Sequence, residues 1–140
     1  MADRIKVLML QAIHEEGILL FDDRFEVIAA RDPSPGAVIP ELDGVQAIIV
    51  RLAPCTREII QAAPDLRVIA KHGVGVDNID VAAATERGIL VLNTPEANAV
   101  SVAEHAIAAI AALAKRVVFM DRAVRDGRWQ ARGELQAIDL

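Results

Sequence analysis

Residues 67–80 read Arg-Val-Ile-Ala-Lys-His-Gly-Val-Gly-Val-Asp-Asn-Ile-Asp, and this stretch decides the fold class. It begins with a short apolar run typical of a buried strand and passes through a glycine turn at residues 73–75. It ends at Asp80, where a helical pattern starts. A strand that leads through a glycine turn into a helix is the repeating step of α/β proteins with parallel sheets. We therefore expect further steps of this kind on both sides of the stretch.

Short apolar runs alternate with helical patterns from residue 5 to residue 93. The expected strands are Ile5–Leu10, Phe25–Ala30, Ala47–Val50, Arg67–Lys71 and Leu90–Asn93. The expected helices are Gln11–Phe21, Ser34–Leu42, Thr56–Ala63 and Asp80–Arg87, the last ended by Gly88. Alternation at this spacing implies right-handed crossovers between parallel strands. The sequence therefore predicts an α/β domain with a parallel sheet of about five strands and helices on both faces.

The last third of the chain carries one long helical pattern. Ser101-Val-Ala-Glu104 fits a capping box, in which the serine accepts from the amide at Glu104 and the glutamate reaches back. Helical spacing continues to about Asp126, Gly127 supplies a stop, and about 26 residues would span about 39 Å. The apolar positions cover more than one stripe, so we expect homo-oligomer formation through this helix. The expected organisation is a domain over residues 1–97, the long helix over 98–127 and a linker or tail over 128–140.

Composition restricts the class of function. The 140 residues carry a net charge of −5 without a basic cluster, which argues against nucleic acid as a partner. The longest apolar run, residues 106–114, is far shorter than the roughly 20 residues that cross a bilayer. With no signal-peptide pattern either, we expect no membrane partner and a cytoplasmic location. The single cysteine, Cys55, excludes an internal disulfide and a cysteine-based zinc site, and we expect no bound metal.

The glycine turn admits three interpretations. Gly73-Val-Gly75 supplies two glycines of the dinucleotide pattern Gly-x-Gly-x-x-Gly, but Asn78 occupies the third position, and the next expected strand ends without the acidic residue that holds the ribose. A nest of backbone amides for a small anion such as a carboxylate fits better, because the carboxyl ends of parallel strands face the ligand crevice. An ordinary turn, with Asp77 or Asp80 capping the next helix, stays open beside it.

Several other residues are candidates on chemical grounds. Arg51 ends the third expected strand and is either an anion ligand or a surface charge. Asn98 precedes the long helix and either binds a ligand or caps the helix. His72 and His105 have acid–base chemistry but no identifiable partner in the sequence, and packing or surface display accounts for both. Cys55 has no neighbouring base and is interpreted as a small hydrophobic residue.

Five segments occur in a characteristic order. They are Arg51 with Thr56, residues 63–80, residues 83–89, Asn93-Thr-Pro-Glu-Ala-Asn98 and Ser101-Val-Ala-Glu-His105. Together, over residues 50–129, they resemble the N-terminal region of D-isomer-specific 2-hydroxyacid dehydrogenases. The resemblance implies a flavodoxin-like substrate-binding domain, with a Rossmann domain inserted into it. It also implies a phosphoglycerate dehydrogenase-like oxidoreductase that uses NAD or NADP and acts on a small 2-hydroxy or 2-oxo acid.

The resemblance also implies which residues bind the substrate. They are Arg51, Val74, Gly75 and Asn98, with the amides of Val74 and Gly75 on the substrate carboxylate. Val74 would also lie against the nicotinamide of the cofactor. Leu52 occupies a position that is usually serine in phosphoglycerate dehydrogenase-like members. The loss of this hydroxyl donor argues against a phosphorylated substrate.

No catalytic residue is expected within this chain. The arginine, glutamate and histidine of the family, and its dinucleotide fingerprint, would lie beyond Leu140. We therefore expect the 140 residues alone to be inactive, to bind no cofactor, and to expose apolar surface where later parts of the domain would pack. The alternative is a stand-alone, non-catalytic module that binds a small acid or regulates. A flavodoxin or a phosphoacceptor receiver is disfavoured, because Gln11 and Arg51 stand where those proteins need a phosphate loop or acidic residues.

Overall fold

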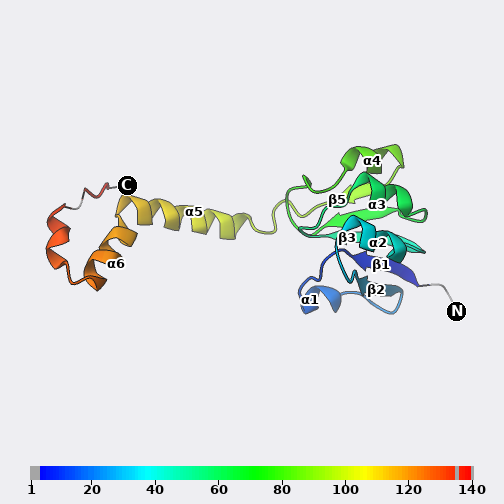
Figure 1. Ribbon diagram of the computed structural model, residues 1–140, viewed down its shortest axis with the longest axis horizontal. Helices are drawn as coiled ribbons and strands as arrows, with labels where there is room; N and C mark the ends of the chain where they lie inside the picture. Colours follow the sequence, from blue (N-terminus) through cyan, green and yellow to red (C-terminus); the bar gives the residue numbers. More distant parts are fainter. Residues whose placement is uncertain (1–3, 135, 140) are drawn as a thin grey trace. The chain divides into compact units, whose positions relative to one another are not determined.

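The computed structural model describes residues 4–134 and 136–139, which form two compact units, Met1–Ala97 and Asn98–Leu140. The first unit contains one parallel sheet in the order β2-β1-β3-β4-β5 (Figure 1). Its strands are β1 Ile5–Met9, β2 Phe25–Ala29, β3 Val45–Val50, β4 Val68–Lys71 and β5 Leu90–Leu92. This is the flavodoxin-type strand order. The predicted fold class and all five predicted strands are confirmed.

Four helices connect these strands. They are α1 Glu15–Ile18, α2 Pro35–Val38, continued by a 3₁₀ turn Ile39–Glu41, α3 Arg57–Ala62 and α4 Val81–Glu86. The Thr56 side chain accepts from the backbone amide of Ile59 at the start of α3, and the Asp80 carboxylate does the same for Ala83 at the start of α4. Gly88 has a φ of +66° just after α4, so it provides the expected stop.

The helix predicted over Gln11–Phe21 is much shorter than expected. Only Glu15–Ile18 is helical, and His14 caps it by accepting a hydrogen bond from the amide of Glu16. The Gln11 side chain instead accepts from two backbone amides in the loop after β3, which places it outside any helix that follows β1. The helical spacing of the apolar residues did not indicate this long-range contact.

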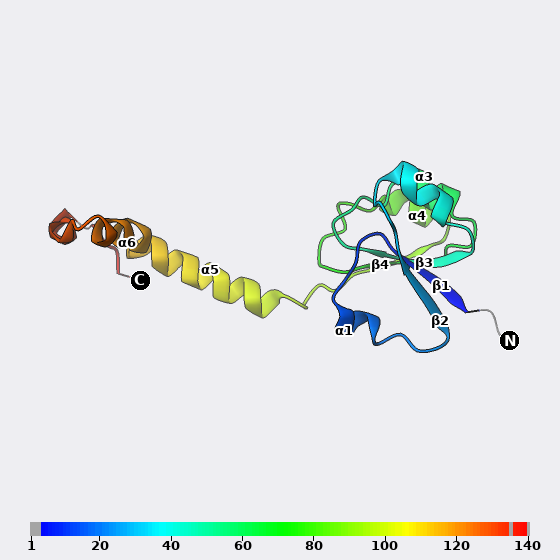
Figure 2. The same ribbon diagram turned by 60° about the horizontal axis from the view of Figure 1, so that its bottom comes forward.

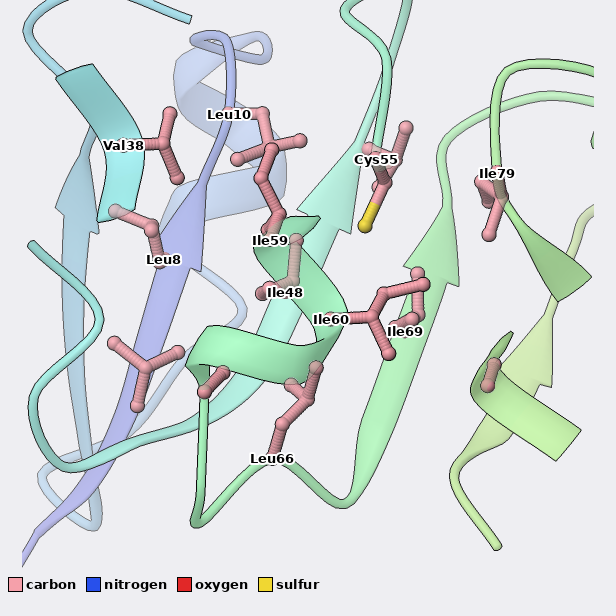
Figure 3. Close-up of a cluster of buried hydrophobic side chains, with 14 of the residues drawn as sticks. Leu8, Leu10, Val38, Ile48, Cys55, Ile59, Ile60, Leu66, Ile69 and Ile79 are labelled. Carbon is pink, nitrogen blue, oxygen red and sulfur yellow. The ribbon is translucent and has the colours of Figure 1, made fainter. Parts of the chain in front are cut away.

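The core of the first unit lies mainly on one face of the sheet. There, α2, α3 and α4 pack onto the sheet, and Ile60 of α3 joins buried strand side chains that include Leu8, Ile48 and Ile69 (Figure 3). On the other face a smaller cluster packs against α1 and the segment after it, and the views of Figures 1 and 2 both place α1 alone on its side. Burying one such side chain contributes about 1.5–3 kcal/mol. The fold therefore rests mainly on the α2–α4 face.

The second unit corrects the prediction of a single helix over residues 98–127. It contains two helices, α5 Ala99–Ala114 and α6 Val117–Arg125. Arg116 separates them in the left-handed conformation, with φ +50° and ψ +40°, and its amide donates to the carbonyl of Leu113. Glycine is the usual residue at such a helix end, because a side chain there costs about 1–2 kcal/mol. Because the residue at this position is arginine, the sequence carries no signal for the break between α5 and α6.

The boundaries of these helices differ from the sequence expectation in two further ways. The chain is already helical at Ala99, so Ser101 lies inside the first turn and the predicted capping box is wrong. Gly127, with φ +69°, follows α6 as the expected stop. Beyond it, Trp129–Glu134 forms a 3₁₀ helix where only a linker or tail was expected. No helix in the described part of the chain is long and apolar enough to cross a membrane.

Candidate functional site

The candidate site lies at the carboxyl ends of β3 and β4. These strands pair in parallel with Val50 beside Lys71, and the amide of His72 donates to the carbonyl of Val50 at 2.8 Å. Arg51 follows Val50 directly, so its loop and the glycine turn start from neighbouring strand ends. Ligands of open α/β sheets bind outside the carboxyl ends of the strands. The structure thus brings two of the predicted binding segments to the same edge.

The glycine turn is tied to the end of β5 through its carbonyl groups. Gly73, with φ +146°, accepts from the amide of Thr94 at 3.0 Å and from its hydroxyl at 3.2 Å. The carbonyl of Val74 accepts from the Asn93 side chain at 2.8 Å. Within residues 4–134 and 136–139, the backbone amides of Val74 and Gly75 donate to no protein acceptor. Two adjacent donors are therefore open to an anion.

Position 75 has little room for a side chain. A Cβ there would lie 2.9 Å from Oδ2 of Asp77, so that carboxylate would have to move. Asp80, rather than Asp77, caps α4, with the amide of Ala83 donating to its carboxylate at 2.8 Å. The helix cap at Asp80 and the open amides at Val74 and Gly75 are therefore compatible, because they involve different residues.

The same turn does not fit a dinucleotide. The pyrophosphate would have to approach the N-terminus of α4, but the carboxylate of Asp80 already accepts the amide hydrogen there and repels a second anion. Asn78, at the third glycine position, uses its side chain to bind Lys71 and the carbonyl of Ala53. At the end of β5, Asn93 bonds to the turn itself. The described residues at this edge suit a small anion instead.

Arg51 is exposed, and its guanidinium makes no hydrogen bond or ion pair to the part of the chain that the structure describes. Its backbone, by contrast, is held: the Lys71 ammonium and the Asn78 side chain both donate to its carbonyl oxygen. Residues Gln11, Lys71, Asn78 and Asn93 were not predicted as site residues. Their backbone partners lie 19 to 42 positions away, so only the assembled sheet reveals these contacts.

Asn98 belongs to the second unit, where it occupies the N-cap position of α5. Its side chain makes no capping hydrogen bond, so the interpretation of Asn98 as a side-chain cap is wrong. Asn98 stays a predicted ligand residue. His72 and His105 are both exposed.

Cys55 is buried, and burial, aided by the nearby Asp80, raises the pKa of its thiol to about 12. A thiol that stays protonated at neutral pH is a poor nucleophile, so Cys55 acts as a core residue. Within the described residues, no group of three or more histidine, cysteine, aspartate or glutamate side chains is placed to hold a metal ion.

An open groove of about 440 Å³ borders the candidate site on the α1 side of the sheet. Its lining is mostly apolar and comes from the α1 segment and from β3 and β4; Lys71, His72 and Thr94 form its polar part. The polar ligands for an acid therefore come from the glycine turn and the Arg51 loop, and this groove contributes apolar surface beside them.

The catalytic-domain model of the D-isomer specific 2-hydroxyacid dehydrogenases matches residues 7–132. The chain belongs to this family. D-3-phosphoglycerate dehydrogenase of Archaeoglobus fulgidus is 42% identical to it over 97% of this chain and 26% of the relative. Glyoxylate reductase of Korarchaeum cryptofilum is 39% identical over 89% of this chain and 39% of the relative. The relatives are oxidoreductases.

The fold of this chain is also found among solved structures. The NADPH-dependent glyoxylate/hydroxypyruvate reductase of Sinorhizobium meliloti, in complex with NADP and malonate, superposes with a TM-score of 0.78 at 28% identity. The match covers 99% of this chain and 42% of that one. The chain thus spans between 26% and 42% of the length of these relatives.

Proposed function

We propose that this chain is the substrate-binding part of an NAD(P)-dependent D-2-hydroxyacid dehydrogenase, and that it binds a small 2-hydroxy or 2-oxo acid. The observation that carries the proposal is the pair of open amides at Val74 and Gly75, at the sheet edge that also bears Arg51. A carboxylate accepts hydrogen bonds from such amides, and a nearby guanidinium attracts it. Family membership supplies the reaction class.

The remaining parts of the reaction are assigned outside this chain. In the proposed enzyme the acid exchanges a hydride with NAD or NADP, and the family's catalytic arginine, glutamate and histidine lie beyond Leu140. Asn98 is a further substrate ligand, and Val74 is the residue that meets the nicotinamide. The carboxylate of Asp80 at the start of α4 supports a cofactor site elsewhere. We therefore expect no turnover and no NADH binding by these 140 residues, and the cytoplasmic location stays a prediction.

The proposal is tested by titrating the ¹⁵N-labelled chain with glyoxylate, hydroxypyruvate and NADH while recording amide NMR spectra. Glyoxylate or hydroxypyruvate is expected to bind with a Kd of about 1 mM or weaker and to shift the amide signals of Val74 and Gly75. Gly75→Pro removes one donor and is expected to abolish this binding. Gly36→Ala is the matched control, because a Cβ at position 36 meets nothing within 4 Å.

Two results would contradict the proposal. If the acid bound equally well to the Gly75→Pro variant, the amides of the turn would not be the site. If the chain alone bound NADH tightly or turned over substrate, the assignment of the cofactor site to residues outside it would be wrong. If the chain bound the acid and its gene encoded no NADH-binding domain, the stand-alone module would be favoured instead.

A second copy of the chain is the proposed protein partner, and α5 is the proposed contact. Its side chains Ile107, Ile110 and Leu113 lie on one side of the helix and are each more than half exposed. Ile110→Glu is expected to weaken self-association about tenfold or more, because it places a charge in an apolar contact. Ser101→Glu is the control, since at 100° per residue it lies on the opposite side of α5. Analytical ultracentrifugation measures both, and a monomer at all concentrations would contradict the contact.

A further inference from the structure

Gln11, which lies two residues after β1, holds one side of the loop that follows β3. The side-chain oxygen of Gln11 accepts hydrogen bonds from the amides of Leu52 and Ala53, both at 2.8 Å. One carbonyl oxygen has two lone pairs, so this arrangement uses its full acceptor capacity. Gln11 therefore fixes the amide side of the loop at residues 52 and 53.

The carbonyl side of the same loop is held from β4 and from the segment that follows the glycine turn. The ammonium of Lys71 and the side-chain amide of Asn78 both donate to the carbonyl of Arg51, the second at 3.3 Å. Asn78 also donates to the carbonyl of Ala53 at 2.7 Å. Lys71 and Asn78 are joined to each other, with the ammonium donating to the Asn78 oxygen at 2.7 Å. Lys71 and Asn78 thus act as one unit on the Arg51 loop.

This arrangement changes what Lys71 can do for a ligand. Two of its three N–H donors are used within the protein, one on the carbonyl of Arg51 and one on Asn78. The guanidinium of Arg51, in contrast, has no partner in the described part of the chain. The carboxylate of Asp77 lies beside Gly75 and adds negative charge. At this edge the guanidinium of Arg51 thus has all its donors free for a ligand, Lys71 keeps only one, and the carboxylate of Asp77 is an anion already present.

We propose that Lys71 and Asn78 are positioning residues, which hold the loop of residues 51–53 so that Arg51 meets a single carboxylate. Lys71 does not bind a second anionic group of the ligand. The ligand class is therefore a monoanionic 2-hydroxy or 2-oxo acid, and a phosphorylated acid gains nothing at this edge. This inference rests on the proposed function and narrows its substrate class.

The experiment combines amide hydrogen exchange with acid titration, both followed by NMR on the full 140-residue chain. Lys71→Met keeps most of the unbranched side chain and removes its donors. It is expected to raise the exchange rates of the Leu52 and Ala53 amides about tenfold and to weaken glyoxylate binding by a similar factor. Lys71→Arg restores donors and is expected to recover most of both effects.

Lys6→Met is the matched control. Lys6 also donates to a backbone carbonyl, that of Asp43 at 2.8 Å, but this bond involves none of the residues that hold the Arg51 loop. The variant is expected to leave the loop exchange rates and the glyoxylate affinity unchanged. Asn78→Leu is expected to behave as Lys71→Met does, because both variants remove a donor from the carbonyl of Arg51.

A comparison of two acids separates positioning from direct binding. The unsubstituted chain is expected to bind 3-phosphoglycerate no more tightly than glyoxylate. The inference is wrong if Lys71→Met weakens 3-phosphoglycerate binding more than glyoxylate binding and leaves the loop exchange rates unchanged, since Lys71 would then be a ligand. If the unsubstituted chain binds neither acid, the proposed function fails and the substrate class with it. The exchange rates still decide in that case whether Lys71 holds the loop.

Discussion

The two units contain similar aliphatic side chains but place them in opposite environments. In Met1–Ala97 the branched side chains of β1, β3 and β4 are mostly buried under α2, α3 and α4. In α5 none of the described side chains is buried, and in the second unit as described only Ala123 and Ala131 are. Apolar composition alone therefore does not indicate a core. The first unit encloses its own core, whereas α5 presents apolar side chains that only another surface would bury.

The largest expected effect tests this contrast directly. Ile48 is fully buried between β1, β4 and the helices above them, and Ile48→Ala is expected to lower the free energy of unfolding by about 2–5 kcal/mol. In the monomeric chain, at concentrations below those of self-association, Ile107→Ala removes the same atoms from an exposed position in α5 and is expected to change this free energy by less than about 0.5 kcal/mol. Urea unfolding followed by circular dichroism measures both. Equal losses for the two variants would show that α5 is packed in solution and would remove the contrast.

A smaller effect concerns how the two units use arginine. The guanidinium of Arg87 donates to the carbonyls of Ile60, Ala63 and Pro64 at the end of α3. Arg87→Ala leaves those acceptors without this donor and is expected to cost about 1–3 kcal/mol of unfolding free energy.

Arg125 in α6 provides the comparison for Arg87. It pairs with Asp121 at 3.0 Å on the surface, one helical turn away. Arg125→Ala is expected to cost less than about 0.5 kcal/mol, because exposed ion pairs contribute little. The same urea experiment tests both substitutions. An Arg125→Ala loss as large as that of Arg87→Ala would mean that α6 depends on its ion pairs as the first unit depends on Arg87.

The smallest expected effect is pH-dependent and belongs to the first unit. Hydrogen bonds from Arg57 lower the pKa of Glu86 below its usual value, and the exposure of this ion pair to solvent limits the effect on stability. A lowered pKa in the folded state means that the stabilisation is present at neutral pH and is lost as the pH falls through that pKa. The stability difference between the unsubstituted chain and Glu86→Gln should therefore shrink from pH 7 to about pH 3. A difference that grows on acidification would contradict this assignment.

The sequence predicts the first unit well because its signals are local. Runs such as Ile48-Ile49-Val50 are apolar on both faces of the sheet, and Thr56, Asp80 and Gly88 mark helix ends by their own chemistry. The break at Arg116 could not be predicted, because arginine carries no preference for the left-handed conformation. The short α1 was missed for a different reason: the Gln11 side chain has a partner 41 residues away.

The candidate site also has features that the sequence predicts and contacts that it does not. The glycine turn is visible in the sequence, since φ +146° at Gly73 requires glycine, and Arg51 is visible as a charge that ends an apolar run. The contacts that hold the Arg51 loop are not visible. Lys71 and Asn78 look like an ordinary strand-end charge and an ordinary turn residue until the sheet places Val50 beside Lys71.

The hydrogen bonds of Gln11 also have a consequence for the order of folding. They join positions 41 and 42 residues apart, so they form only after β1 and β3 have closed a long loop between them. The binding edge therefore forms with or after the pairing of β1 with β3, which joins residues about as far apart in the sequence. By linkage, an acid that binds only the closed edge adds its binding free energy to the stability of the folded state. The melting temperature of the chain would then report ligand occupancy without any catalytic assay.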